Sequence, residues 1–187
     1  MNSLENIDRV VFSLLNGWNA PCLDPVMFFL SSFWFWIPVI VFFIFLIIKV
    51  YKKKFWIPLV IAVLCFAITD QSSNLAKKTF KRYRPTHNTE ISESVHTVNG
   101  YQGGQYGFFS GHAANSFGLA LISLLFIRKK YFTIIVILWA LIVSYSRIYL
   151  GVHYPSDVCV GAVYGSIIAY VLYILFRKVF KNQLVNK

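Results

Sequence analysis

The chain has 187 residues, of which 57% are hydrophobic and 18% aromatic, while only 13% are charged. This composition excludes an ordinary soluble domain and predicts a protein embedded in a lipid bilayer. The formal net charge of +11 does not indicate nucleic-acid binding, because most basic residues lie at the ends of apolar segments.

The N-terminal segment is apolar on one side over residues 9–22, but it is too short and too interrupted to cross a membrane securely. We predict an interfacial amphipathic helix within residues 1–24, with a sixth membrane span as the alternative. A signal peptide is not expected, because Glu5 and Asp8 stand where its basic region would be and no small-residue cleavage site follows.

Long apolar runs dominate the rest of the chain. Residues 26–48 form a nearly uninterrupted run, about 35 Å long as a helix, which is enough to cross a hydrocarbon core of about 30 Å. Similar runs occupy roughly residues 55–76, 112–127, 131–148 and 158–176. The predicted fold class is all-α: a single-domain integral membrane helical bundle with five or six transmembrane helices. Its core covers residues 26–176, and residues 177–187 form a basic cytoplasmic tail.

Basic residues at alternate connections between the runs predict the orientation. They are Lys49, Lys52, Lys53 and Lys54, then Arg128, Lys129 and Lys130, then Arg177, Lys178 and Lys181. Cytoplasmic loops carry such an excess, so the C-terminus is expected in the cytoplasm. The connections 77–112 and 147–157 would then lie on the periplasmic or extracellular face. The small size of the chain favours a bacterial inner membrane.

Three polar clusters, each at the boundary of an apolar run, interrupt the chain. They read K-x6-R-P, S-G-H and S-R-x5-H-x3-D, and their members are Lys77, Arg84 and Pro85, then Ser110, Gly111 and His112, then Ser146, Arg147, His153 and Asp157. One fragment could arise by chance, but all three in order within about 80 residues are a strong signal.

The cationic and helix-start members of the clusters suit a phosphoryl group. Lys77, Arg84 and Arg147 can together neutralise a phosphoryl dianion. Ser110 and Gly111 stand where a helix would begin, so a hydroxyl and unpaired backbone N–H groups are available there to phosphate oxygens. A helix N-cap is the structural alternative for Ser110. These five residues are the candidate phosphate-binding residues.

The histidines and the carboxylate of the clusters suit nucleophilic and proton-transfer chemistry. Asp157 follows His153 by four residues, and Pro155 between them suits the start of a helix. The carboxylate can accept the proton of one imidazole nitrogen and leave the other free to attack phosphorus. His153 is therefore the candidate nucleophile, and His112 and Asp157 complete the candidate catalytic set.

Charged residues beside the first cluster have less specific predictions. Asp70 and Lys77 share one face of a predicted helix, so we expect an orienting or packing role for Asp70. Lys78 and Arg82 fall on other faces, where contact with lipid headgroups is expected.

The segment after this helix is predicted to leave the membrane. Pro85 disfavours helical geometry at Arg84, so the helix should end near Tyr83. Residues 86–107 form the one long polar stretch of the chain, and we expect this loop to cover the pocket.

At these clusters the chain resembles the type 2 phosphatidic acid phosphatase family, which is related to the vanadium-dependent haloperoxidases. The resemblance covers roughly residues 55–175 and rests on the three patterns quoted above. The family's middle motif usually reads P-S-G-H, whereas Phe109 precedes Ser110 here.

The resemblance implies a membrane lipid phosphatase or diphosphatase that works through a phosphohistidine on His153. His112 would protonate the departing oxygen and then help to activate water. Undecaprenyl diphosphate or a lipid A phosphate is the favoured substrate, because both present phosphate at that face of a bacterial inner membrane. Phosphatidic acid and phosphatidylglycerol phosphate are further candidates.

Partners other than the lipid phosphate substrate and membrane lipids are not indicated, and neither is an oligomeric state. No metal or other cofactor is expected, because the seven acidic residues are scattered without the cluster that a two-metal site needs. A non-catalytic protein that binds or moves lipid phosphates is the alternative. It is disfavoured because binding alone would need only the cations. A haloperoxidase would share the pocket but is disfavoured by the membrane spans.

Overall fold

The computed structural model describes residues 3–180, and within them every regular element is helical. The α-helices are α1 (Ser3–Gly17), α2 (Asp24–Leu30), α3 (Phe33–Tyr51), α4 (Trp56–Phe80), α5 (Gly111–Ile127), α6 (Lys130–Tyr149) and α7 (Pro155–Val179). Short 3-10 turns are η1 (Lys52–Lys54), η2 (Pro85–His87) and η3 (Ser92–Ser94). The predicted all-α class is confirmed. The part of the predicted basic tail from 181 to 187 lies outside the described residues.

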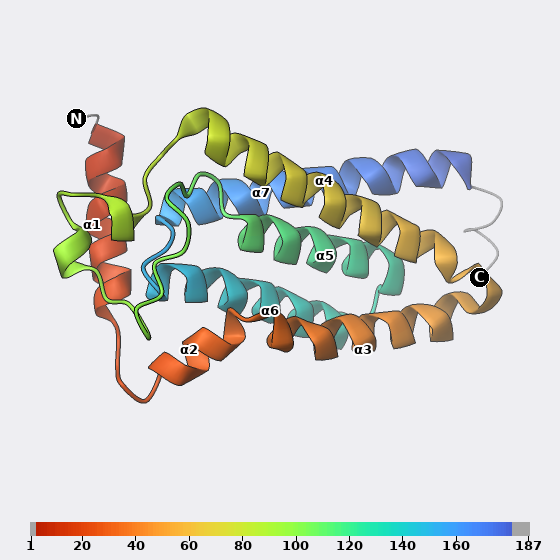
Figure 1. The fold of residues 1–187 in the computed structure, drawn as a ribbon. Coiled ribbons are helices and arrows are strands. Elements are labelled where there is room, and N and C mark those ends of the chain that lie inside the picture. The colour runs from red at the N-terminus through yellow and green to blue at the C-terminus, as the bar shows by residue number, and fades with distance from the viewer. Residues whose placement is uncertain (1–2, 181–187) are drawn as a thin grey trace.

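Four helices are long and apolar enough to cross a membrane: α3 with η1, α4, α6 and α7. The fifth predicted span, α5, is apolar but has only 17 residues, and it runs between α4, α6 and α7 in the middle of the bundle (Figure 1). A short helix can occupy this position because its neighbours, rather than lipid, surround most of it. The membrane bundle is therefore built as predicted, around a short central helix.

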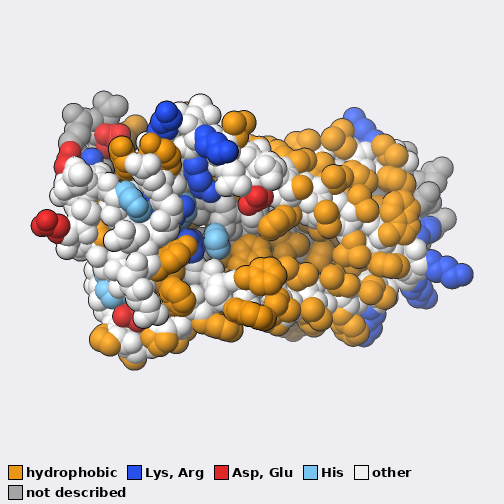
Figure 2. Space-filling model, in the orientation of Figure 1, with side chains coloured by type: hydrophobic (Ala, Val, Ile, Leu, Met, Phe, Trp, Pro, Cys, Tyr) orange, Lys and Arg blue, Asp and Glu red, His pale blue; other side chains and the backbone are white. Residues whose placement is uncertain are grey.

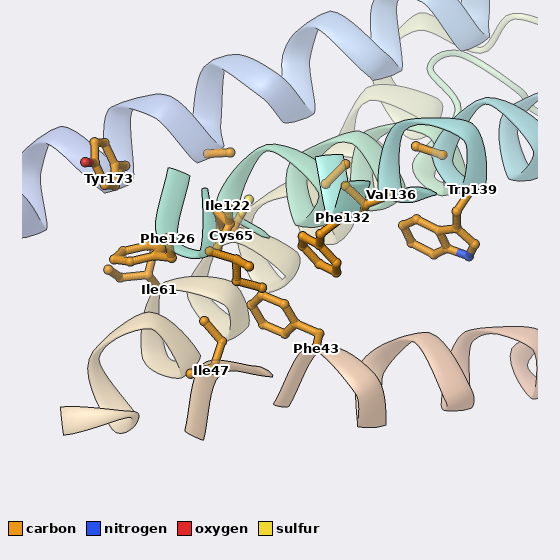
Figure 3. Packing of buried hydrophobic residues seen from close by; sticks show 14 of the residues in the cluster. Phe43, Ile47, Ile61, Cys65, Ile122, Phe126, Phe132, Val136, Trp139 and Tyr173 are labelled. Atoms are coloured by element: carbon orange, nitrogen blue, oxygen red, sulfur yellow. The ribbon is translucent and has the colours of Figure 1, made fainter. Parts of the chain in front are cut away.

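The apolar core of the bundle joins all five of these helices. Phe43 and Ile47 from α3, Ile61 from α4, Phe126 from α5 and Trp139 from α6 lie in one buried cluster, which Tyr173 of α7 also joins (Figure 3). Aromatic rings meet edge to face within it, for example Phe126 and Tyr173 with centroids 5.3 Å apart. This core lies away from α1. The polar clusters lie at the α1 end of the bundle, and the packed core supports the helices that carry them.

Two glycines bring α7 into very close contact with α5. A Cβ atom at Gly165 would lie 2.0 Å from the carbonyl oxygen of Ala114, and one at Gly161 would lie 2.5 Å from that of Ser110. Small residues allow helix backbones in a membrane to approach in this way. The backbone N–H of Ser110 donates to the carbonyl oxygen of Asp157 at 3.0 Å. The close contact thus places the second and third polar clusters side by side.

The predicted continuous run 26–48 is wrong in detail, because the chain breaks at Ser31 and Ser32. Helix α2 ends at Leu30 and α3 begins at Phe33. Ser32 is extended, with φ −81° and ψ 157°, and its hydroxyl donates to the carbonyl oxygen of Phe29 at 2.7 Å. A serine hydroxyl that bonds to nearby backbone competes with helix continuation. Helix α4 likewise ends at Phe80 rather than near Tyr83, because Lys81 adopts a left-handed conformation with φ 49°.

Helix α1 lies across the end of the bundle rather than along it (Figure 1). It has 15 residues and is not among the helices long enough to span. Phe12 is buried against Tyr154, and the Asn16 amide donates to the carbonyl oxygens of Ile148 and Tyr149. The sixth-span alternative is therefore not supported. Contact of its exposed apolar face with the membrane surface stays a prediction.

Candidate active site

The three polar clusters meet in one cavity of about 420 Å³ at the end of the bundle near α1. Its polar lining includes Lys77, Arg84, Gly111, His112, Arg147 and His153, and its apolar wall includes Phe33, Trp36, Ile40 and Phe66. Figure 2 shows basic and histidine side chains gathered at a hollow beside the apolar surface of the bundle. Six of the eight predicted site residues line this cavity, and Asp157 lies behind it against His153.

His153 lies at the floor of the site with 2% of its surface exposed. Its Nδ1 is 3.5 Å from Oδ2 of Asp157, and its Nε2 is 3.4 Å from Nη1 of Arg84. Burial lowers the pKa of His153 well below its usual value, and the positive charges of Arg84, Arg147 and Lys77 lower it further. The ring is therefore unprotonated at neutral pH, and Nε2 is the nitrogen on the side of the cations.

The local sequence explains why Asp157 meets His153. Tyr154 is extended before Pro155, with φ −72° and ψ 155°, and forms the N-cap of α7. Asp157 is the third residue of this helix, and its Oδ2 accepts the backbone N–H of Tyr154 at 3.1 Å. This capping arrangement turns the carboxylate back toward the residue before the cap, which is His153.

Arg84 is held beside His153 by backbone carbonyl groups. Its Nε donates to Tyr106 and its Nη1 to Val152, both at 3.1 Å, and 8% of the residue is exposed. Burial lowers the pKa of Arg84 to about 10, with a further contribution from the charge of Arg147. The guanidinium stays charged at neutral pH, so a cation faces the cavity next to the imidazole.

Arg147 reaches the cavity from the last turn of α6 and is held by two other segments. Its Nη1 donates to the hydroxyl of Ser31, and its Nη2 donates to that of Tyr101 at 3.2 Å. The guanidinium also lies over the ring of Tyr101, 5.6 Å from its centroid. Its Nε is buried without a hydrogen-bond partner among the described residues, so one donor is left for a ligand.

The start of α5 faces Lys77 of α4 across the cavity. The Lys77 ammonium donates to the hydroxyl of Ser73 at 3.4 Å. A Cβ at Gly111 would lie 2.8 Å from that hydroxyl oxygen and 3.6 Å from the Lys77 nitrogen, so a larger residue would displace the Ser73 side chain. His112, the next residue, lines the cavity with its ring edge to face on Trp36, 6.1 Å between centroids.

Ser110, like Asp157, is a predicted site residue that does not line the cavity. It is fully buried, and its hydroxyl accepts the backbone N–H of Ala113 at 3.4 Å, which caps α5. The structural alternative for Ser110 is thus realised, and a direct bond from it to phosphate stays a prediction. Phe109 before it is buried against Tyr164, 4.9 Å between ring centroids, and this packing anchors the loop where the family usually has proline.

The predictions about neighbouring charges have different outcomes. Asp70 lines the cavity and its carboxylate accepts the Asn74 amide at 3.1 Å, so its orienting or packing role stays a prediction. The expected contact of Arg82 with lipid headgroups is wrong, because this guanidinium is paired with Asp157 and Asp8 at 2.6 Å each. Helix α4 ends at Phe80 and Lys81 is left-handed, so Arg82 does not continue the helical face on which the prediction placed it.

Sequence reasoning missed three residues that hold the site: Asp8, Ser31 and Tyr101. Tyr101 lies within the polar loop that was expected to cover the pocket, so its region was predicted but not its contact with Arg147. Asp8 and Ser31 lie far from the motifs in sequence, and no local pattern distinguishes them from other acidic or hydroxyl residues. Their roles come from long-range packing alone.

The model of the PAP2 superfamily matches residues 56–181 of the chain. A lipid A 4'-phosphatase of Porphyromonas gingivalis is 37% identical over 177 residues, which cover 92% of this chain and 74% of that relative. An undecaprenyl-diphosphatase of Sulfolobus acidocaldarius is 31% identical over 163 residues, covering 86% and 74%.

A solved structure supports the same fold. The first transmembrane PAP2 type phosphatidylglycerolphosphate phosphatase from Bacillus subtilis superposes with a TM-score of 0.76 at 22% identity, covering 96% of this chain and 89% of that one. The motifs, the fold and these relatives agree. The chain therefore belongs to the PAP2 superfamily and is a membrane lipid phosphatase.

Proposed function

We propose that this protein removes phosphate from a lipid headgroup through a covalent phosphohistidine on His153, with the 4'-phosphate of lipid A as the favoured substrate. The observation that carries the proposal is the meeting of the His153 imidazole with Lys77, Arg84 and Arg147 in one cavity. The lipid A 4'-phosphatase that is 37% identical favours this substrate. Undecaprenyl diphosphate is the second candidate, favoured by the relative that is 31% identical.

The three cations bind and stabilise the phosphoryl group. Its negative charge spreads over the equatorial oxygens during transfer, so fixed positive groups around the cavity stabilise the transition state more than the ground state. Arg84 and Arg147 are buried and held by fixed acceptors, so little reorganisation is needed when the substrate enters. The N–H groups at the start of α5 add neutral donors.

The chemical steps follow from the positions of the two histidines. Nε2 of His153 attacks phosphorus, a P–N bond forms, and the P–O bond to the lipid breaks. His112 gives a proton to the departing oxygen. It then takes a proton from water as the water oxygen attacks phosphorus, which breaks the P–N bond and releases inorganic phosphate. Asp157 balances the positive charge that develops on the His153 ring.

Lateral entry from the bilayer suits the shape of the site. Phe33, Trp36 and Ile40 of α3 and Phe66 of α4 wall the cavity, and Phe33 and Phe66 are exposed on the outside of the bundle. Figure 1 shows α3 and α4 diverging from their connection toward the end where α1 lies. Acyl chains can therefore stay in the membrane while the headgroup reaches the cations.

The orientation that we propose places this cavity on the periplasmic or extracellular face of a bacterial inner membrane. The α3–α4 connection, the α5–α6 connection and the end of α7, which carry basic residues, lie at the opposite end of the bundle (Figure 1). An excess of basic residues marks the cytoplasmic side, so the cavity faces away from it.

Phosphate release from purified lipids tests the proposed function. The panel contains lipid A, undecaprenyl diphosphate, phosphatidic acid and phosphatidylglycerol phosphate, with a metal chelator present in a parallel series. Wild type is expected to have its highest kcat/KM for lipid A with or without chelator. His153→Ala should lose turnover while remaining folded and inserted, whereas His87→Ala, a histidine outside the cavity, should retain it. Turnover by His153→Ala at the wild-type rate would refute the nucleophile. Binding without turnover by wild type would favour the non-catalytic alternative.

A further inference from the structure

The carboxylate of Asp157 is bound on both of its oxygens. Oδ2 faces His153 and accepts the Tyr154 backbone N–H, while Oδ1 lies 2.6 Å from Nη1 of Arg82. The carboxylate is fully buried. A buried charge is tolerated when it is paired and its remaining lone pairs are used, and Arg82 supplies the pairing charge.

Arg82 is in turn held by the N-terminal helix. Its Nη2 lies 2.6 Å from Oδ2 of Asp8 in α1, and its guanidinium lies over the ring of Tyr154 at 4.4 Å from the centroid. Its Nη1 also donates to the hydroxyl of Ser156 at 2.7 Å. Asp8 accepts the backbone N–H of Ser156 at 2.9 Å and its hydroxyl at 2.5 Å. Charge-assisted bonds therefore run without interruption from α1 to the carboxylate beside His153.

Both residues stand outside the substrate cavity. Neither Asp8 nor Arg82 is among the residues that line it. Asp8 also lies outside residues 56–181, the part of the chain that the superfamily model covers. Their contacts with the site are therefore those with Asp157 and with the start of α7.

We propose that Arg82 and Asp8 are positioning residues of the reaction, which hold the Asp157 carboxylate against His153 so that the ring presents Nε2 to phosphorus. Helix α1 thereby becomes part of the catalytic unit through Asp8. The inference rests on the proposed function of His153. An orienting carboxylate matters because it selects the ring tautomer and stabilises the charged ring as the bond forms.

The charges around His153 give the direction in which the pKa of its ring should change when Arg82 is substituted. Lys77, Arg84, Arg147 and His112 face the ring from the cavity side, and Asp157, backed by Arg82 and Asp8, faces it from the other side. Removing the Arg82 charge removes one cation from this field. Protonation of the ring then costs less free energy, because the ring is repelled by one positive charge fewer. The pKa of His153 should therefore rise in an Arg82 variant.

The test compares Arg82→Gln and Asp8→Asn with wild type by steady-state kinetics and by NMR titration of the His153 ring nitrogens. Both variants should lose about tenfold or more in kcat, the scale of one lost charge-assisted hydrogen bond, while KM stays near wild type. In Arg82→Gln, the ring should take up its proton at higher pH than in wild type. Arg82→Lys, which keeps the charge, should recover part of kcat.

Matched controls separate this role from a general loss of packing. Glu90→Gln removes another ion pair between α1 and the loop, that with Arg9, without touching Asp157, and Lys78→Gln removes an exposed cation near Arg82. Both controls should keep the wild-type kcat and titration.

The outcomes distinguish a failure of this inference from a failure of the proposed phosphatase function. Unchanged kcat in Arg82→Gln and Asp8→Asn, together with an inactive His153→Ala, would overturn the inference and leave the phosphatase intact. A loss of kcat that only tracks the loss of folded protein, with the His153 titration unchanged, would overturn it as well. If Arg82→Gln does not fold in detergent, Asp8→Asn decides, because Arg82 stays paired with Asp157 in that variant. A wild type that releases no phosphate would instead refute the proposed function.

Discussion

The guanidinium of Arg147 illustrates how single residues are prepared for an anion. It is 3% exposed, and among the described residues it donates to the hydroxyl groups of Ser31 and Tyr101 and pairs with no carboxylate. A buried cation without an acidic partner is costly to the folded protein. In the function that we propose, an incoming phosphate pairs with this cation, so the charge remains available to the substrate.

Ser31→Ala tests the fixation of Arg147. The variant removes one acceptor of a charged donor, a change worth about 1.5–3 kcal/mol, so we expect kcat/KM to fall about tenfold or more. Ser32→Ala is the matched control, because its hydroxyl bonds only to the carbonyl oxygen of Phe29 among the described residues and should leave kinetics unchanged. Equal kinetics for Ser31→Ala and wild type would contradict the role of Ser31.

The His153 ring should remain neutral below the pH at which a free histidine gains its proton. Burial and the neighbouring cations lower its pKa from 6.5. The unfolded chain takes up this proton near pH 6.5 while the folded ring does not, so stability should decrease as pH falls below 6.5. Ring-nitrogen NMR of the labelled protein, assigned with His153→Ala, measures the titration. A midpoint at 6.5 or above would contradict the described environment.

At the scale of elements, the contact between α5 and α7 decides whether two motifs meet. The glycines at 161 and 165 let the backbones touch, and Ser110 then bonds to Asp157 across the contact. His112 starts one helix and His153 precedes the other, so a change in helix spacing changes the distance between the two histidines.

Gly165→Ala tests this spacing. The added Cβ would lie 2.0 Å from the carbonyl oxygen of Ala114, so the backbones must separate. Overpacking of this kind costs about 1–3 kcal/mol, and we expect a lower Tm in detergent together with reduced kcat. Gly104→Ala, where nothing lies within 4 Å of the added atom, should change neither. A wild-type Tm for Gly165→Ala would show that the contact is softer than described.

The break between α2 and α3 shows where element prediction from sequence stops. Hydropathy over residues 26–48 is compatible with one long helix, because two serines barely interrupt the apolar run. The structure ends α2 at Leu30 instead, and the freed Ser31 hydroxyl accepts Arg147. The break itself has a local cause in Ser32, but the contact of Ser31 with Arg147 joins residues more than a hundred positions apart, so local periodicity does not contain that contact.

The two ends of the whole molecule differ in the position of the cavity and in the distribution of basic residues. The cavity lies at the end of the bundle that carries α1, and basic side chains lie at the other end (Figure 2). Apolar surface covers the length between them, as expected for helices in lipid.

Thiol labelling tests the orientation that we propose. Cys22, exposed between α1 and α2, lies at the cavity end. In a Cys159→Ser background, a membrane-impermeant maleimide added outside intact cells with a permeable outer membrane should label Cys22. A cysteine introduced by Lys53→Cys in a background with both Cys22→Ser and Cys159→Ser should react only after the inner membrane is opened. The reverse pattern would place the cavity in the cytoplasm.

The sequence by itself determined the membrane class, the helical fold, the family and most of the site. The length of each apolar run can be read directly from the chain. So can the identity and order of the motif residues, which are Lys77, Arg84, His112, Arg147 and His153. Only the tertiary structure decided which distant groups hold these residues, because a hydrogen bond between segments requires packing that brings them together. Ser31 at Arg147 and Asp8 at Arg82 are such partners. No local sequence pattern marks these two residues, and their contacts form only because the helical bundle brings them to the arginines.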